Sequence, residues 1–181
     1  MLPLLGEDHS ANSSYSAGKS PDPVTMKLTR TDKKILDVLQ HDSGVTNVEL
    51  AERVGLSASP CLRRVKQLEA AGLISGYVAL LDRRKAKLDL LAYVEVAVDR
   101  HNEAAAEAFK EAILREPMVV GCHAMTGSYD YLLRVVAPNL DAYAEFTMKR
   151  LLKMPAVKDI QSSFVLETIK DSTALPLDYL E

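Results

Sequence analysis

The chain has 181 residues, of which 48% are hydrophobic and 26% charged, and its formal net charge is −3. This length and composition are typical of one large or two small globular domains. No apolar run approaches the roughly 20 residues of a membrane span, and the N-terminus lacks a signal-peptide pattern, so we expect a cytoplasmic protein without membrane contact. The two cysteines, Cys61 and Cys122, are too few and too far apart for a disulfide framework, and we expect both to be small buried residues.

The first organised segment follows a polar N-terminal stretch. Residues 1–26 are rich in Ser, Asn, Gly and Pro and show no periodicity, which predicts a disordered tail. Residues 29–41 then show helical spacing of apolar residues, and Thr29 and Asp32 have the separation of a capping box. This segment is predicted to be the first of three helices.

Two further helices are predicted between Thr46 and Ala71, joined by a sharp turn. Thr46 and Glu49 again have capping-box spacing, and Gly55 stands where a helix end favours a left-handed residue. Ser57 is the predicted cap of the second of these helices, and Pro60 falls in its first turn, where a missing N–H is tolerated. The pattern is that of a helix-turn-helix motif.

The second helix of this motif has two different faces. At about 100° per residue, its packing face contains Cys61, Val65, Leu68 and Gly72, and its opposite face contains Ser59, Arg63, Lys66 and Gln67. Guanidinium and amide groups match base edges in the DNA major groove. An ordinary helical hairpin with a solvated basic face would show the same spacing, so this motif alone leaves both interpretations open.

Charge is distributed unevenly along the chain. Residues 27–87 carry twelve cationic and seven anionic side chains, whereas residues 88–181 carry nine and fifteen. This asymmetry favours a nucleic-acid partner for the first half only. We expect a short strand or wing in residues 73–82 and a linker in residues 81–89, which are charged and without periodicity.

The second half of the chain alternates strands and helices. Strands are predicted at residues 90–98, 118–125, 131–136 and 157–169, and helices at 102–115 and from 138 to Pro155, where Leu140, Tyr143, Thr147 and Leu151 are in line. The order βαββαβ predicts a ferredoxin-like domain over residues 90–170, followed by a C-terminal tail at 171–181. The predicted fold class is therefore α+β, with a three-helix DNA-binding domain at residues 27–80.

The predicted sheet has one face that its own helices leave uncovered. Val94, Val96 and Val98 alternate with Tyr93 and Ala97, which we interpret as too apolar for a face in water. A homodimer that packs sheet against sheet is expected, and its two helix-turn-helix motifs would read a palindromic double-stranded DNA site.

Two runs of residues carry a resemblance to a known family. The run NVELAERVGLSASPCLRRVKQLEAAGLISGYVALLD, followed by CHAMTGSYDYLLRV, closely resembles the Lrp/AsnC family of leucine-responsive and asparagine-responsive regulators. The resemblance extends over residues 28–170. It implies a winged helix-turn-helix, an amino-acid-sensing ferredoxin-like domain, and dimers that assemble further, often to octamers.

The resemblance also implies positions for two sites. The residues expected to meet DNA are Ser57, Ser59, Pro60, Arg63, Arg64, Lys66 and Gln67. Those expected to form the effector loop are Gly127, Ser128, Tyr129, Asp130 and Tyr131. From the residues alone, the second group is better explained as a hairpin turn, with glycine for a positive φ and aspartate for local hydrogen bonding.

The sequence predicts neither catalysis nor a cofactor. There is no phosphate-binding loop or nucleophile elbow, and Cys122 and His123 lack a second ligand pair at zinc spacing. The favoured function is a transcriptional regulator modulated by a small amino acid. Two alternatives remain: an architectural protein that wraps DNA without responding to an effector, and an enzyme or carrier that acts on an amino acid.

Overall fold

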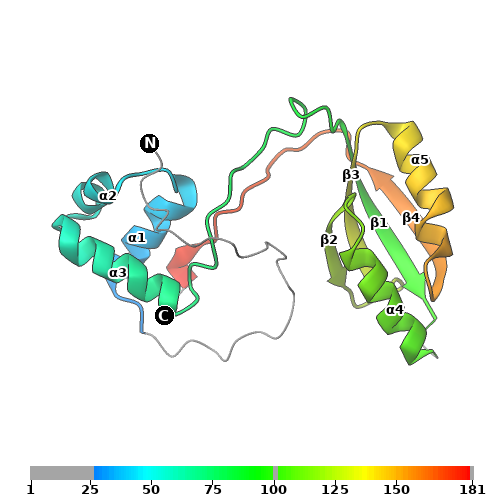
Figure 1. Cartoon of the computed structure of the whole chain (residues 1–181), viewed down its shortest axis with the longest axis horizontal. Coiled ribbons are helices and arrows are strands. Elements are labelled where there is room, and N and C mark those ends of the chain that lie inside the picture. The colour runs from blue at the N-terminus through cyan, green and yellow to red at the C-terminus, as the bar shows by residue number, and fades with distance from the viewer. Residues whose placement is uncertain (1–26, 100–101, 180–181) are drawn as a thin grey trace. The chain divides into compact units, whose positions relative to one another are not determined.

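The computed structural model describes residues 27–99 and 102–179 and contains two compact units (Figure 1). The first unit comprises residues 27–79 together with the C-terminal segment from residue 171, and the second comprises residues 80–170. The chain therefore passes twice between the units. The predicted N-terminal tail lies outside the described residues. Within them, no helix has both the length and the apolar character needed to cross a membrane.

Three helices form the first unit. They are α1 (Arg30–His41), α2 (Asn47–Val54) and α3 (Ala58–Ala70). Both predicted capping boxes are present, since the side chain of Thr29 accepts from the Asp32 amide and that of Thr46 accepts from the Glu49 amide. One apolar face of each helix meets in a common core, which contains Ile35, Leu39, Val45, Leu50, Ala51, Val54, Cys61, Val65 and Leu68.

The turn between α2 and α3 follows the prediction in its backbone. Gly55 is left-handed, with φ 74° and ψ 38°, and the next amide, that of Leu56, donates to the carbonyl of Ala51 at 2.8 Å. The side-chain amide of Asn47 donates to the carbonyl of Ala58 at 2.8 Å and so joins the beginnings of the two helices. Ser57 occupies the N-cap position of α3, but its hydroxyl makes no capping hydrogen bond.

The segment that follows α3 differs from the sequence prediction. Gly72 does not lie on the packing face, because it follows the end of the helix in a left-handed conformation, with φ 73°. Of the strand or wing expected at residues 73–82, the strand was wrong: a strand needs a hydrogen-bonded neighbour, and the described chain provides none there. The hydroxyl of Tyr77 donates to Glu69 at 2.9 Å, which fastens this segment to α3.

The second unit has the predicted βαββαβ order. Its elements are β1 (Leu90–Val98), α4 (Glu103–Leu114), β2 (Val119–Ala124), β3 (Tyr131–Ala137), α5 (Leu140–Lys149) and β4 (Val157–Phe164), with a 3₁₀ turn at Leu151–Lys153. The antiparallel sheet has the strand order β2-β3-β1-β4. The α+β, ferredoxin-like fold class is therefore confirmed.

One face of the sheet packs against both helices. Val94, Val96 and Val98 are buried with Phe109 and Ile113 of α4 and with Tyr143 and Phe146 of α5. Leu140, which the sequence placed in the buried line of α5, is 59% exposed, because the first residue of a helix has neighbours from its own helix on only one side.

The last strand is shorter than predicted. β4 ends at Phe164, opposite Ala92, and its partner β1 begins only two residues earlier, at Leu90. Residues beyond 165 therefore have no strand to pair with, and Leu166 and Ile169 are almost fully exposed. The prediction of a strand to residue 169 was wrong because apolar character alone does not supply a neighbour.

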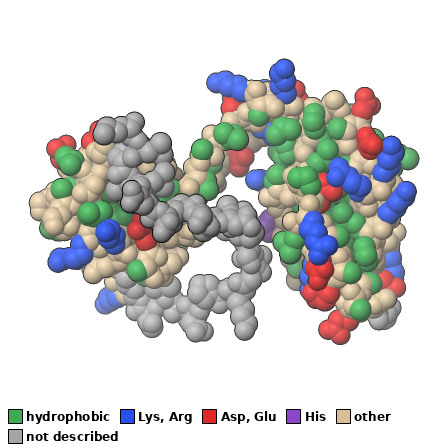
Figure 2. Space-filling model, in the orientation of Figure 1, with side chains coloured by type: hydrophobic (Ala, Val, Ile, Leu, Met, Phe, Trp, Pro, Cys, Tyr) green, Lys and Arg blue, Asp and Glu red, His purple; other side chains and the backbone are tan. Residues whose placement is uncertain are grey.

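The open face of the sheet carries more polar residues than the sequence predicted. Because the alternate valines of β1 face the helices, the opposite face presents Tyr93 and Glu95, paired in register with Arg134 and Gln161 of the neighbouring strands. Figure 2 views this unit from the side of α4 and α5, where charged side chains of both signs are interspersed with apolar ones. The open face therefore mixes polar residues with apolar ones such as Leu132, which lies opposite Glu95, and a homodimer through this face stays a prediction.

The C-terminal segment packs against the first unit. The side-chain amide of Gln40 on α1 donates to the Leu175 carbonyl at 3.0 Å and accepts from the Leu175 amide at 2.9 Å. Both backbone groups of one residue are thus paired with a single side chain, as in a strand pair. A short 3₁₀ turn follows at Leu177–Tyr179.

Candidate functional site

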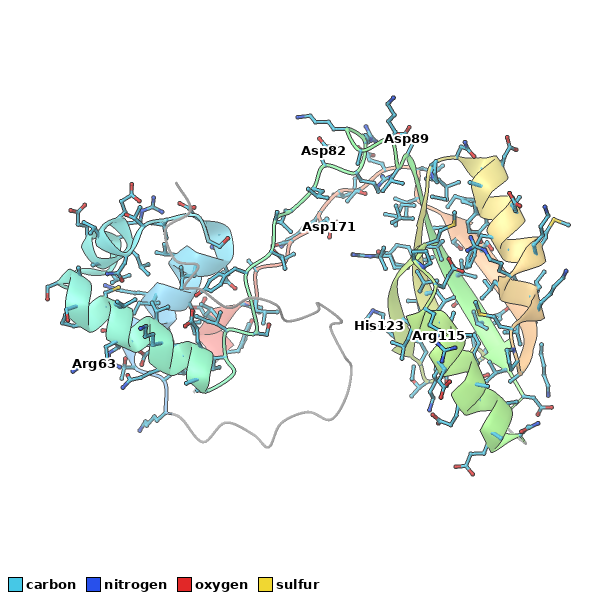
Figure 3. The ribbon with its side chains drawn as sticks, viewed as in Figure 1. Arg63, Asp82, Asp89, Arg115, His123 and Asp171 are labelled. Atoms are coloured by element: carbon cyan, nitrogen blue, oxygen red, sulfur yellow. The ribbon has the colours of Figure 1, made fainter. Side chains whose placement is uncertain are left out.

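The outer face of α3 carries most of the residues predicted to meet DNA. Ser57, Ser59, Arg63, Lys66 and Gln67 are exposed, and their side chains make no hydrogen bond to another residue in the described part of the chain. Arg63 points away from the helix into solvent (Figure 3). Pro60, in the first turn of α3, is half-buried. The face therefore offers one flexible guanidinium, one ammonium, an amide and two hydroxyls to a partner.

Arg64 is placed differently from its neighbour Arg63. Its Nη1 lies 3.0 Å from Oδ1 and 3.2 Å from Oδ2 of Asp32 on α1. The Asp32 side chain is fully buried, whereas 35% of the Arg64 side chain is exposed. Burial by itself raises the pKa of Asp32, but hydrogen bonds from the side chain and backbone of Thr29 and from Arg64 outweigh it and leave the pKa below its ordinary value. The carboxylate is thus charged at neutral pH.

The predicted effector loop forms the connection between β2 and β3. Gly127 has φ 119°, a conformation that side chains rarely adopt. The amide of Asp130 donates to the carbonyl of Val96 at 2.9 Å, and its carbonyl accepts from the amide of Met125 at 2.8 Å. The Asp130 carboxylate accepts from the amide of Val98 at 2.8 Å. Asp130 therefore closes the turn and attaches it to the end of β1.

Two cavities flank this turn. The larger, of about 840 Å³, is an open cleft against α4 and is lined by Gly127 and Asp130. The smaller, of about 230 Å³, opens beside Glu95 and is lined by Ser128 and Tyr129, whose hydroxyl donates to Gln161 at 3.1 Å. Tyr131 lines both. The five predicted residues are thus contiguous in sequence but divided between two cavities.

Charged residues of α4 complete the larger cleft, and the sequence analysis did not single them out. Glu103, Glu107 and Lys110 line it opposite the turn. The Lys110 ammonium donates to Glu107 at 2.6 Å, and this hydrogen bond, with the attraction of the two charges, raises the pKa of Lys110. Helical periodicity predicts only that these side chains face solvent. The packing of α4 onto the sheet is what brings them beside the turn.

The cysteines and histidines form no metal site in the described residues. No group of three or more His, Cys, Asp and Glu side chains there is arranged to hold an ion. Cys61 is buried as predicted, but Cys122 is exposed, so the expectation of two buried thiols was half wrong. His123 projects from β2 (Figure 3).

Comparison with known families matches both units. Residues 28–75 match the model of a winged helix-turn-helix DNA-binding domain, and residues 91–175 match that of the Lrp/AsnC ligand-binding domain. The leucine-responsive regulatory protein of Escherichia coli is 40% identical over 148 residues, which are 82% of this chain and 90% of that protein.

Solved structures show the same architecture. A transcriptional regulator of Neisseria meningitidis in complex with L-Met has a TM-score of 0.83 and 46% identity, and the match covers 85% of this chain and 99% of that one. An AsnC family regulator of Agrobacterium tumefaciens has a TM-score of 0.81 and 40% identity, with coverage of 85% and 100%. The chain, which is not an enzyme, thus belongs to the Lrp/AsnC family of DNA-binding transcriptional regulators and carries that family's ligand-binding domain.

Proposed function

We propose that this regulator binds a small zwitterionic amino acid in the larger cleft and that the ligand changes its occupancy of DNA in the cytoplasm. The observation that carries this proposal is the charge pattern of the cleft. Glu103 and Asp130 supply carboxylates that suit an ammonium, and Lys110 supplies a cation that suits a carboxylate. The regulator of Neisseria meningitidis was crystallised with L-Met, which is such a ligand.

The proposed DNA site is the outer face of α3. Arg63 is the proposed base reader, because its planar fork can donate two hydrogen bonds to guanine, worth about 1 to 3 kcal/mol of discrimination. Lys66 and Arg64 are proposed to meet phosphates, with Ser57, Ser59, Pro60 and Gln67 at the edges of the contact. A homodimer, assembling further toward an octamer, would present these helices in pairs to a palindromic site.

A ligand acts on such a regulator only through unequal affinity. If L-methionine bound every assembly and every inter-dimer geometry equally, DNA occupancy would not change. The proposal therefore requires that the occupied cleft favour one assembly, and light scattering of the full chain with and without the amino acid measures this directly.

The function is tested by binding to the DNA upstream of the protein's own gene and to random DNA, over a salt series, with and without L-methionine or L-leucine. We expect preference for the upstream DNA and a shift with one amino acid. Arg63→Ala should reduce that preference, whereas Lys66→Ala should weaken both DNAs alike and lower the salt dependence by about one phosphate contact. Binding that ignores both sequence and amino acid would identify an architectural protein instead.

A further inference from the structure

Arg64 occupies the boundary between the two faces of α3. The residues next to it in the packing direction, Val65 and Leu68, are buried, while Arg63 and Lys66 are exposed. The Arg64 side chain is 35% accessible to solvent, while its Nη1 is held by both oxygens of Asp32. The remaining N–H groups of the fork have no hydrogen-bond partner among the described residues, and a phosphate oxygen could accept from them.

Contacts at the N-terminus of α1 hold Asp32 in place independently of Arg64. It is the third residue of α1, and its Oδ2 accepts from the Thr29 amide at 2.8 Å and from the Thr29 hydroxyl. The carboxylate is fully buried and cannot reach a partner outside the protein. The capping box of α1 therefore fixes the Asp32 carboxylate, and this carboxylate in turn fixes one end of the Arg64 guanidinium on α3.

We propose that Asp32 is a positioning residue for DNA binding: it sets the roll of α3 against α1 and aims the free edge of Arg64 at a DNA phosphate. The inference rests on the proposed contact between Arg64 and DNA. A long arginine side chain loses substantial rotamer freedom when it is immobilised, and pre-alignment by Asp32 removes much of that loss before DNA arrives. An acidic residue thereby strengthens binding to a polyanion.

The sign of this effect separates it from ordinary electrostatics. Removing an anion from a DNA-binding domain reduces repulsion and normally strengthens binding. Asp32→Asn is expected instead to weaken binding to the upstream DNA by about tenfold, the lower range of a hydrogen bond to a charged group. Asp37→Asn is the matched control, because Asp37 is an exposed acid on the same helix whose carboxylate lies 3.6 Å from Nδ1 of His41 rather than beside α3. It should leave binding unchanged or slightly stronger.

The experiment is a double-mutant cycle on the full chain, with Asp32→Asn, Arg64→Ala and the double variant, measured over a salt series. We expect Arg64→Ala to weaken binding about tenfold and to lower the salt slope by about one. The double variant should bind no more weakly than Arg64→Ala alone, and Asp32→Asn should lower the salt slope in the same direction. A change of slope reports the lost phosphate contact, which a merely structural defect would not alter.

A variant that retains the charge distinguishes a lost contact from misfolding. Arg64→Lys keeps the cation, but its ammonium lacks the planar fork that can join Asp32 and a phosphate together, so we expect a loss of about tenfold with an unchanged circular dichroism spectrum. If Arg64→Ala binds as tightly as the parent protein, the proposed DNA contact of Arg64 fails. If Arg64→Ala weakens binding but Asp32→Asn does not, or if the two effects are additive, the positioning role of Asp32 is overturned.

Discussion

Asp130 combines a structural hydrogen bond with a proposed contact to the ligand, and two different substitutions separate the two. Its carboxylate lines the cleft proposed for the amino acid, where it would face the ammonium, and it also accepts a hydrogen bond of 2.8 Å from the amide of Val98. Replacing Asp130 with alanine removes both roles. Replacing it with asparagine removes the charge but retains an oxygen of nearly the same position.

The structural role can be given a magnitude. A hydrogen bond to a charged group contributes about 1.5 to 3 kcal/mol, and Asp130 is half-buried, so a value near the lower end applies. Val98 is only 7% exposed, so its unpaired amide would find little water in its place. We therefore expect Asp130→Ala to destabilise the second unit by about 2 kcal/mol and Asp130→Asn by less than about 1 kcal/mol.

Two measurements report the two roles. Urea denaturation with hydrogen exchange of the peptide containing Val98 follows the structural role, and calorimetric titration with L-methionine follows the ligand role. If Asp130 faces the ammonium, both variants should lose at least about tenfold in affinity, since each lacks the charge.

The ligand contact and the structural hydrogen bond of Asp130 are tested separately. An asparagine variant that binds L-methionine as tightly as the parent protein would show that Asp130 supports the turn without contacting the ligand. An alanine variant as stable as the parent protein would refute the importance of the bond to Val98. If the parent protein bound neither L-methionine nor L-leucine, the proposed effector class would be wrong, and only the structural role of Asp130 would remain to be measured.

Two other expectations concern the first unit. In the folded protein the pKa of Asp32 lies below its ordinary value of about 3.9. The ionised Asp32 carboxylate therefore contributes its full stabilisation above that pH and loses it as the pH falls through the folded pKa. Circular dichroism from pH 6 to 2 should accordingly show steeper acid unfolding in the parent protein than in Asp32→Asn. Gly55→Ala should destabilise this unit by about 1 kcal/mol through its φ of 74° alone, since nothing lies within 4 Å of an added Cβ. Gly76→Ala, equally unobstructed but without a positive φ, should change stability by less than about 0.5 kcal/mol in the same urea titration, and equal losses in both variants would contradict the explanation.

The sequence by itself was sufficient for features that depend on near neighbours in the chain. The two capping boxes, the left-handed Gly55 and the helical spacing of apolar residues in α1 were all predicted, because each depends on residues within about four positions of one another. The alternation of β1 was predicted for the same reason, and with the order of elements it was enough to determine the ferredoxin-like topology.

The predictions that failed depend on partners distant in the chain. Apolar character could not show that residues 73–82 and 165–169 have no neighbouring strand, or that the valines of β1 face the helices rather than the open side. The proposed effector residues were predicted as one loop, and only the packing of α4 divides them between two cavities and adds Lys110 to one.

The pairing of Arg64 with Asp32 shows the same limit most clearly. The helical spacing placed Arg63, but not Arg64, on the outward face of α3, and no local pattern identifies a partner for Arg64. The tertiary structure does, because the packing of α3 on α1 brings Arg64, thirty-two residues away in the chain, to within 3.0 Å of the Asp32 carboxylate, while Arg63 stays exposed. Local sequence thus determined which helices form and which faces they bury, and tertiary contact decided which charged side chains remain available for a ligand.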